Sequence, residues 1–122
     1  MSKKILIVDD EADIVETLKF MAEANGYKCY CAYDGEEGLS KAKEIMPDLI
    51  ILDVMMPKIN GFKICRLLKY DKKFKDIKIL MITARSQDSD KLIGEETGAD
   101  EYITKPFDIN EVMEKIQKHL EA

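Results

Sequence analysis

The chain has 122 residues, of which 46% are hydrophobic and 35% are charged, and its formal net charge is −5. This length suits one domain with a single buried core, and the composition excludes a disordered chain. The negative charge argues against direct binding to nucleic acid or to anionic membranes. No apolar run approaches the length of a membrane span and no signal-peptide pattern is present, so we expect a cytoplasmic protein.

The predicted elements alternate from the start of the chain. Residues 4–9 (KILIVD) form a continuous apolar run, which is typical of a strand covered by helices on both faces of a parallel sheet. A helix follows, because four apolar residues recur at helical spacing and a glycine stands where a C-terminal cap is expected. These residues are Ile14, Leu18, Met21, Ala22 and Gly26. Residues 27–33 (YKCYCAY) are mixed in polarity and predict an edge strand.

The middle of the chain repeats this alternation. Asp34 and Glu37 resemble a capping box at the start of a second helix, and Pro47 ends that helix. Residues 49–53 (LIILD) are continuously apolar up to the final aspartate and predict another buried strand. Residues 61–68 carry the apolar stripe of a third helix.

The last third of the chain begins with a buried strand at residues 78–83 (KILMIT) and contains a short edge strand at residues 101–104 (EYIT). Between them, residues 88–97 predict a helix of poor propensity, because Gly94 lies inside it and few of its residues are apolar. The last helix is predicted from a cap and from an apolar face at helical spacing. Asp108 and Glu111 would form the cap. The inner face would comprise Ile109, Val112, Met113, Ile116 and Leu120.

These five β–α units fill residues 1–122 without a linker or a repeat. The alternation predicts an α/β fold in one domain, with a doubly wound five-stranded parallel sheet and helices on both of its faces.

Polar residues collect where the strands end. The first strand ends in Asp9 and Asp10, the third in Asp53, the fourth in Thr83, and Lys105 follows the fifth. Ligands of doubly wound sheets bind at this edge. Taken singly, each residue has a plain alternative: Asp9 or Asp10 as a helix cap, Thr83 as an ordinary strand end, and Lys105 as part of an exposed loop.

Asp53 is harder to explain in that way, because it closes an aliphatic run and a buried carboxylate costs several kcal/mol without a partner. Two carboxylates about 5 Å apart repel by roughly 3 kcal/mol at an effective dielectric of 20, so a cluster of three requires a cation. Oxygen ligands on an open edge suit Mg²⁺. We therefore predict that Mg²⁺ and Lys105 balance Asp53, whose position suits a nucleophile.

Four motifs follow one another along nearly the whole chain: VDDE (8–11), LDVMMPKINGF (52–62), ITA (82–84) and GADEYITKPF (98–107). Together they resemble the receiver domain of two-component response regulators. The resemblance implies the strand order 2-1-3-4-5 and a phosphorylation-dependent signalling switch. It also implies a sensor histidine kinase or phosphotransfer protein as the donor, and a downstream protein or a fused output domain as the target.

The resemblance implies a role for each matched residue. Asp53 would accept the phosphoryl group from a phosphohistidine, and Lys105 would pair with a phosphoryl oxygen. Asp10, Asp53 and the backbone carbonyl of Met55 would bind Mg²⁺, with Mn²⁺ as an alternative ion. Asp9 would act through a metal-bound water.

Other matched residues would act in switching and in resetting. Thr83 would move its hydroxyl onto the phosphoryl group, and Tyr102 would rotate inward behind it. Met55 and Arg85 would tune dephosphorylation, and because neither offers a carboxylate or an amide to orient water, we expect slow hydrolysis. The peptide bond before Pro106 is expected to be cis. The domain would catalyse only its own phosphotransfer and autodephosphorylation, and is otherwise not an enzyme.

The output surface is predicted on the fourth helix, the fifth strand and the fifth helix. Its charges have both signs, and we expect them to allow a phosphorylation-dependent homodimer, with a solvated monomer surface as the alternative. They are Lys91, Asp100, Glu101, Glu111, Lys115 and Lys118.

Two other classes of protein compete with this interpretation. A Mg²⁺-dependent phosphatase of the haloacid dehalogenase type also places an aspartate nucleophile after a buried strand, but it requires a carboxylate where this chain has Met55. An electron carrier of the flavodoxin type requires a phosphate-binding loop after the first strand, where Asp9, Asp10 and Glu11 would repel a phosphate.

Two features remain outside the motifs. Cys29, Cys31 and Cys65 are expected to be reduced core residues, with a metal site of Cys29, Cys31 and His119 as the less favoured interpretation. The basic stretch KYDKKFKDIK (69–78) is expected to be a solvated loop, with a partner-docking patch as the alternative.

Overall fold

The structure is a computed structural model that describes residues 2–56, 58–83 and 98–121. Strands and helices alternate along these residues. In chain order they are β1 (Lys4–Val8), α1 (Ala12–Ala24), β2 (Lys28–Ala32), α2 (Gly35–Ile45), β3 (Leu49–Asp53), α3 (Gly61–Lys69), β4 (Lys78–Thr83), β5 (Glu101–Thr104) and α5 (Ile109–Leu120). The predicted helix at residues 88–97 lies outside the described residues.

The five strands form one parallel sheet in the order β2-β1-β3-β4-β5, which confirms the predicted fold and strand order. The mixed-polarity strands β2 and β5 lie at the edges, as predicted. Two predicted strands are slightly shorter in the structure. β1 ends at Val8, one residue before Asp9, and β2 covers only Lys28–Ala32.

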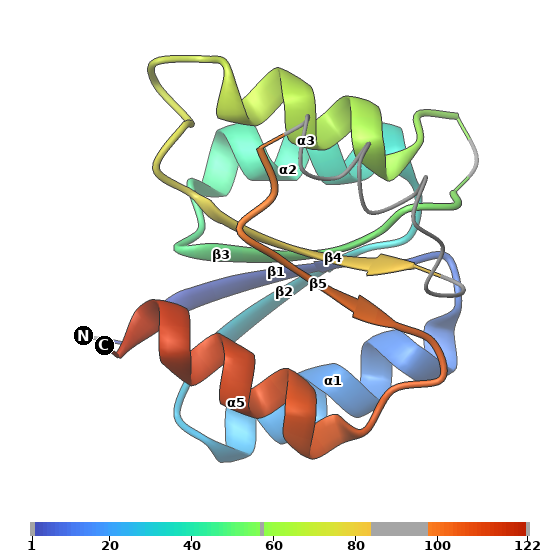
Figure 1. The fold of residues 1–122 in the computed structure, drawn as a ribbon, viewed down its shortest axis with the longest axis vertical. Helices are drawn as coiled ribbons and strands as arrows, with labels where there is room; N and C mark the ends of the chain where they lie inside the picture. The colour runs from blue at the N-terminus through green and yellow to red at the C-terminus, as the bar shows by residue number, and fades with distance from the viewer. Residues whose placement is uncertain (1, 57, 84–97, 122) are drawn as a thin grey trace.

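Helices cover both faces of the sheet, with α2 and α3 on one side and α1 and α5 on the other (Figure 1). Because successive strand residues point to opposite faces, each buried strand supplies both layers, which explains its unbroken apolar run. Strand residues facing α1 and α5 include Ile5, Ile7, Leu49, Ile51, Leu80 and Ile82. Those facing α2 and α3 include Leu6, Val8, Ile50, Leu52, Ile79 and Met81.

Side-chain caps fix the starts of α2 and α5. The Asp34 carboxylate accepts a hydrogen bond from the N–H of Glu37 at the start of α2, as predicted, but the Glu37 carboxylate accepts from Tyr33 rather than returning to Asp34. The Asp108 carboxylate caps α5 by accepting a hydrogen bond from the N–H of Asn110. At the other end of the molecule, the chain leaves α1 through Gly26 with a φ of 92°, a backbone conformation that favours glycine.

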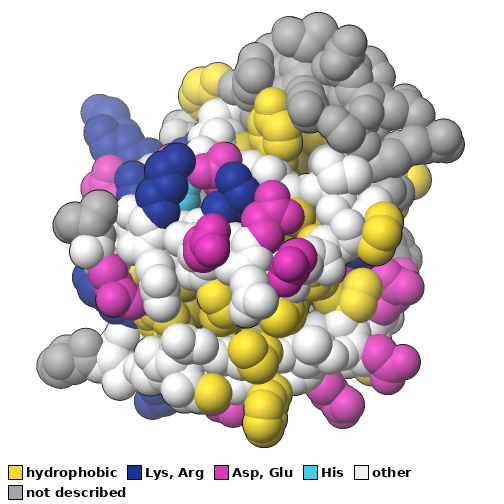
Figure 2. Space-filling model, turned by 60° about the horizontal axis from the view of Figure 1, so that its bottom comes forward, with side chains coloured by type: hydrophobic (Ala, Val, Ile, Leu, Met, Phe, Trp, Pro, Cys, Tyr) yellow, Lys and Arg dark blue, Asp and Glu magenta, His cyan; other side chains and the backbone are white. Residues whose placement is uncertain are grey.

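Figure 2 shows a face on which charged side chains of both signs, with a histidine among them, gather above exposed hydrophobic side chains. Within the ranges that the structure describes, no helix is both long and apolar enough to cross a lipid bilayer. All three cysteines are free, and Cys65 is buried. The grouping of potential metal ligands found in those same ranges consists of aspartates, so the Cys29–Cys31–His119 interpretation gains no support.

Candidate functional site

The sheet brings the sequence-predicted polar residues to one edge. Asp53 ends β3, and Thr83 ends β4 opposite Thr104, the last residue of β5. Asp9 follows directly after β1, and Lys105 follows directly after β5. Because the strands are parallel, all of these residues lie at the carboxyl edge, where doubly wound folds bind their ligands.

Three carboxylates form an acidic cluster at this edge. Asp9, Asp10 and Asp53 each place an oxygen so that the three atoms lie within 4.8 Å of one another. Asp9 and Asp53 are buried, at 2% and 5% exposure, whereas Asp10 is exposed. Burial, followed by the charge of Asp9, raises the pKa of Asp53 to about 6, and burial raises the pKa of Asp9.

Lys105 is the cation of this cluster. Its Nζ lies 2.9 Å from Glu11 Oε2, 3.3 Å from Asp9 Oδ2 and 3.6 Å from Asp53 Oδ2. Burial alone would favour a neutral lysine, but the hydrogen bond to Glu11 and the charges of Asp53 and Asp9 raise the pKa of Lys105. The predicted pairing of Lys105 with Asp53 is therefore present. Sequence reasoning missed Glu11 as its nearest partner, although Glu11 belongs to the VDDE motif.

The acidic cluster still has unused capacity to bind a cation. Asp9 Oδ1 accepts from the N–H of Glu11 at 2.9 Å, but the buried Asp9 Oδ2 receives no hydrogen bond from the described residues, and its distance to Lys105 is that of an ion pair. Among the described residues, the hydrogen bond that Asp53 Oδ1 accepts is a long one, 3.4 Å from the N–H of Met55. An all-oxygen set with an orphaned buried carboxylate oxygen fits a hard divalent cation such as Mg²⁺.

Thr83 and Tyr102 lie on the same face of the sheet. Tyr102 pairs with Met81, two residues before Thr83, and side chains two apart along a strand share a face. Thr83 is buried at 6% exposure, and Tyr102 is half-buried against the apolar cluster under α2 and α3. This arrangement places the aromatic ring on the side of the sheet toward which Thr83 points. Arg85, the second residue expected to tune dephosphorylation, lies outside the described residues.

A close backbone approach holds α3 against the end of β3. A Cβ added at Gly61 would lie 2.4 Å from the carbonyl oxygen of Asp53 and 2.9 Å from Val54 Cα. The N–H of Gly61 donates to Val54, and Asn60 caps the helix through the N–H of Lys63. Gly61 therefore sets the position of the loop that follows Asp53. The sequence signal was the Asn-Gly pair at a helix start, which carried no assigned role.

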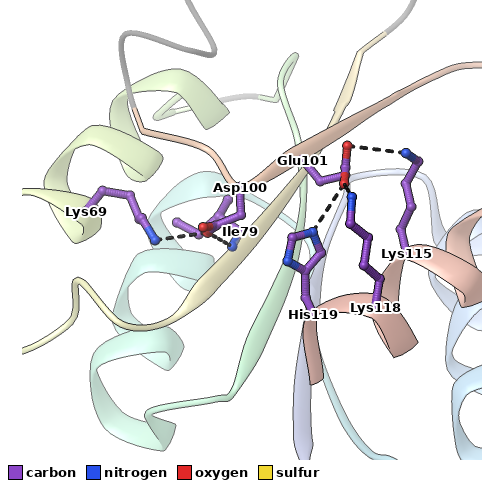
Figure 3. Close-up of polar contacts among 7 residues, drawn as sticks. All are labelled: Lys69, Ile79, Asp100, Glu101, Lys115, Lys118 and His119. Atoms are coloured by element: carbon purple, nitrogen blue, oxygen red, sulfur yellow. Dashed lines mark hydrogen bonds and ion pairs between the residues drawn. The ribbon is translucent and has the colours of Figure 1, made fainter. Parts of the chain in front are cut away.

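A second polar network joins β5 to its neighbours (Figure 3). The Glu101 carboxylate contacts three side chains of α5: Lys115 Nζ at 3.3 Å, Lys118 Nζ at 3.3 Å and His119 Nε2 at 3.2 Å. Burial opposes ionisation of Glu101, but hydrogen bonds from His119, Lys115 and Lys118 outweigh it and lower its pKa.

Just before β5, Asp100 Oδ2 accepts from Lys69 Nζ at 2.9 Å and from the N–H of Ile79 at 2.8 Å (Figure 3). Four charged residues predicted for the output surface, Asp100, Glu101, Lys115 and Lys118, thus pair within this chain. Lys91 lies outside the described residues.

Comparison with known proteins agrees with this geometry. The family model of the response regulator receiver domain matches residues 5–117. The chain is 48% identical, over 117 residues, to the alkaline phosphatase synthesis transcriptional regulatory protein PhoP of Bacillus subtilis. That alignment covers 96% of this chain and 48% of PhoP, so the chain spans about half the length of this relative.

Solved structures give the same result. A putative response regulator from Chloroflexus aurantiacus superposes with a TM-score of 0.93 and 34% identity, covering 100% of both chains. DrrB of Thermotoga maritima, an OmpR/PhoB homologue, superposes with a TM-score of 0.91 and 30% identity, covering 99% of this chain and 54% of DrrB. The phosphatase and flavodoxin alternatives gain no support. Fold, motifs and acidic edge agree, and the chain belongs to the receiver domain family of two-component response regulators.

Proposed function

We propose that Asp53 is the phosphoacceptor of this receiver domain. An Asp53 oxygen attacks the phosphorus of a phosphohistidine on a sensor kinase or phosphotransfer protein. The new P–O bond replaces the P–N bond, and the histidine leaves. The observation that carries this proposal is the position of Asp53, a carboxylate at the carboxyl edge of a central strand with Lys105 Nζ 3.6 Å away.

The neighbouring residues would prepare the site for a doubly charged phosphoryl group. Asp10, Asp53 and the Met55 carbonyl would hold Mg²⁺, or Mn²⁺ in its place, with Asp9 acting through a water. When bound, the metal neutralises negative charge on the transferring group. Lys105 would exchange its contact with Glu11 for a phosphoryl oxygen, and this exchange is easy because the Glu11 side chain is 59% exposed.

Phosphorylation would be relayed through Thr83 and Tyr102. The Thr83 hydroxyl would turn to the phosphoryl group, and the Tyr102 ring would enter the space it leaves. The shared sheet face of the two side chains supports such a coupling between them. The affected surface would comprise residues 88–97, β5 and α5, and its readers would be a downstream protein, a fused output domain or a second copy of the chain. Length supports the fused domain, because PhoP is about twice as long.

The proposal extends to the chain as a whole. Residues 1–122 would form one receiver domain that works in the cytoplasm and catalyses no reaction beyond its own phosphotransfer and dephosphorylation. Slow dephosphorylation is part of the proposal, since Met55 and Arg85 lack groups that orient water. The Met55 side chain is 71% exposed, so it would have to fold over the phosphoryl group to shield it.

A small-molecule phosphodonor tests the proposal without the kinase. With acetyl phosphate and Mg²⁺, intact-mass spectrometry should show the addition of one phosphoryl group, which is lost in base or hydroxylamine. Asp53→Asn should abolish the addition, and so should chelation of Mg²⁺. The matched control, Asp76→Asn, removes an exposed carboxylate that precedes β4 and so lies away from the carboxyl edge of the sheet. This variant should be phosphorylated normally. A full mass shift in Asp53→Asn would refute the assignment.

Beryllofluoride, a mimic of the phosphoryl group, tests the proposed change of surface. Amide hydrogen exchange between residues 88 and 120 should respond to it, and sedimentation should show a dimer at high concentration. A dimer must exchange pairs such as Glu101–Lys115 for contacts between chains, so we expect weak association. An unchanged exchange pattern in this range would contradict the surface assignment, and a persistent monomer would contradict the dimer.

A further inference from the structure

Helix α3 exposes an apolar pair on its outer face. Leu67 and Tyr70 are 44% and 72% exposed, and Tyr70 is the C-cap residue of the helix. Together with Lys63 and Arg66, which are also exposed, they follow the i, i+3, i+4, i+7 spacing of a single helix face. The opposite face, which includes Ile64, is buried in the core. Exposed apolar side chains that gather on one face mark interaction sites more often than isolated ones do.

The surroundings of this pair are strongly basic. Residues 63–78 contain seven cations and two carboxylates, a net charge of +5, so the remainder of the chain carries −10 out of the total of −5. Five of these cations are exposed, and among the residues that the structure describes none of the five forms an ion pair with a carboxylate. They are Lys63, Arg66, Lys72, Lys73 and Lys75.

The segment that carries these charges is anchored. Phe74 and Ile77 are buried at 6% and 5% exposure and tie the turn after α3 to the core. The Asp71 carboxylate accepts from the N–H of Lys73 at 2.8 Å, and the Asp71 carbonyl accepts from Phe74 and Lys75. The exposed lysines of this segment therefore extend from a backbone that is anchored to the core.

A hollow of about 650 Å³ lies in the middle of this surface. It is lined by Arg66, Leu67, Tyr70, Asp71 and Lys72, which means two apolar side chains, two cations and one carboxylate. Apolar and basic side chains together match the composition of protein interfaces, in which apolar anchors are accompanied by charged contacts that set orientation.

We propose that residues 63–78, the basic α3 surface, are a docking site for an acidic segment of a partner protein. An apolar side chain of that segment packs against Leu67 and Tyr70, and its carboxylates pair with the surrounding lysines and Arg66. Charge complementarity selects this occupant. Nucleic acid and anionic membranes fit less well, because both extend beyond the basic α3 surface and meet the rest of the chain, whose charge is −10, whereas a short acidic segment contacts the basic surface alone.

The basic α3 surface is remote from the phosphorylation site. In Figure 1 the C-terminal end of α3 and the turn that follows lie at the end of the sheet opposite the arrowheads of β4 and β5, where Asp53 and Lys105 are found. A partner held there leaves the carboxyl edge open to a phosphodonor. The proposal therefore does not depend on phosphorylation of Asp53, and the two can fail separately.

The test uses a synthetic peptide of Glu and Asp with one Phe and one Leu a helical turn apart. Titrated into the ¹⁵N-labelled chain, it should shift amide resonances of residues 63–78 and leave those around Asp53 unchanged. Leu67→Ser with Tyr70→Ser should weaken binding at least about tenfold, because apolar anchors dominate interface energies. Lys72→Glu with Lys73→Glu should weaken it similarly.

Two matched control variants distinguish binding at this site from nonspecific binding of the peptide. Phe20→Ser removes an aromatic side chain that is also 72% exposed but lies on α1, and Lys43→Glu reverses an exposed charge on α2. Both should leave peptide affinity unchanged, and all variants should keep the dispersed amide resonances of the unsubstituted chain, which shows that they fold. The proposal is overturned by shifts outside residues 63–78 or by equal losses in the controls. Tighter binding of duplex DNA or anionic vesicles, or occupation of the surface by a second copy, also overturns it.

Discussion

Replacing Asp53 with asparagine should stabilise the metal-free protein at neutral pH. The folded structure raises the pKa of this carboxyl from 3.8 to about 6, because burial and the charge of Asp9 disfavour the ionised form. At about 1.4 kcal/mol per pKa unit, ionised Asp53 costs about 3 kcal/mol of folding free energy above pH 6. Asparagine carries no charge, and Lys105 keeps Asp9 and Glu11 as partners. We expect the free energy of unfolding to rise by about 1–3 kcal/mol.

The stability gained by Asp53→Asn should increase with pH. The folded state holds the Asp53 proton more tightly than the unfolded state does, so the penalty is absent below about pH 4 and complete above about pH 6. Urea unfolding in EDTA at pH 7.5 and pH 4.5 should therefore show a gain for Asp53→Asn that shrinks at the lower pH. Asp76→Asn, an exposed control, should change stability by less than about 0.5 kcal/mol at either pH. If the variant is no more stable than the unsubstituted chain at pH 7.5, or if its gain in stability does not depend on pH, then ionised Asp53 does not destabilise the fold.

Three further predictions follow from the surroundings of the site. Gly61→Ala should destabilise by about 1–3 kcal/mol in urea unfolding and slow phosphorylation, because its Cβ meets backbone atoms that cannot yield; an unchanged midpoint would contradict the contact. Asp100→Ala should cost about 2–3 kcal/mol in the same assay, since it removes the partner of the Ile79 N–H and the carboxylate of Lys69, which keeps the Ile77 carbonyl; Lys69→Met in the same chain should recover part of the loss. Met55→Asn with Arg85→Glu should speed release of inorganic phosphate from the phosphorylated chain, and an equal or slower rate would remove the basis for the slow reset.

The fold was predictable because its signals are local and repeated. Continuous apolar runs identified the buried strands, and the strand order came from the resemblance carried by the four motifs. The acidic edge was predictable for a related reason. Once parallel strands are assigned, their carboxyl ends meet, so Asp9, Asp53, Thr83 and Lys105 had to lie close together.

Contacts that depend on side-chain direction were not predictable. Glu11 lies closest to Lys105, but nothing in its position after two aspartates distinguishes it from a solvated glutamate. The pairing of Lys69 with Asp100 joins residues 31 positions apart, and no periodicity reports such a contact. The hydroxyl of Tyr27 donates to Glu121, a contact between residues 94 positions apart.

The basic stretch shows how structure changed an interpretation. From its sequence, residues 69–78 were indistinguishable from a charged loop. In the structure, Leu67 and Tyr70 are exposed on the preceding helix, and the buried Phe74 and Ile77 anchor the segment that carries the lysines. These lysines therefore belong to an anchored surface.

Identifying the phosphorylated residue shows whether Asp53 is the phosphoacceptor. The chain phosphorylated with acetyl phosphate and Mg²⁺ is reduced with borohydride, which converts an aspartyl phosphate to homoserine, and is then sequenced by tandem mass spectrometry. We expect homoserine at position 53, and aspartate at that position when Mg²⁺ is chelated. Homoserine at position 9 or 10, or an intact Asp53 in a chain that has gained a phosphoryl group, would contradict it.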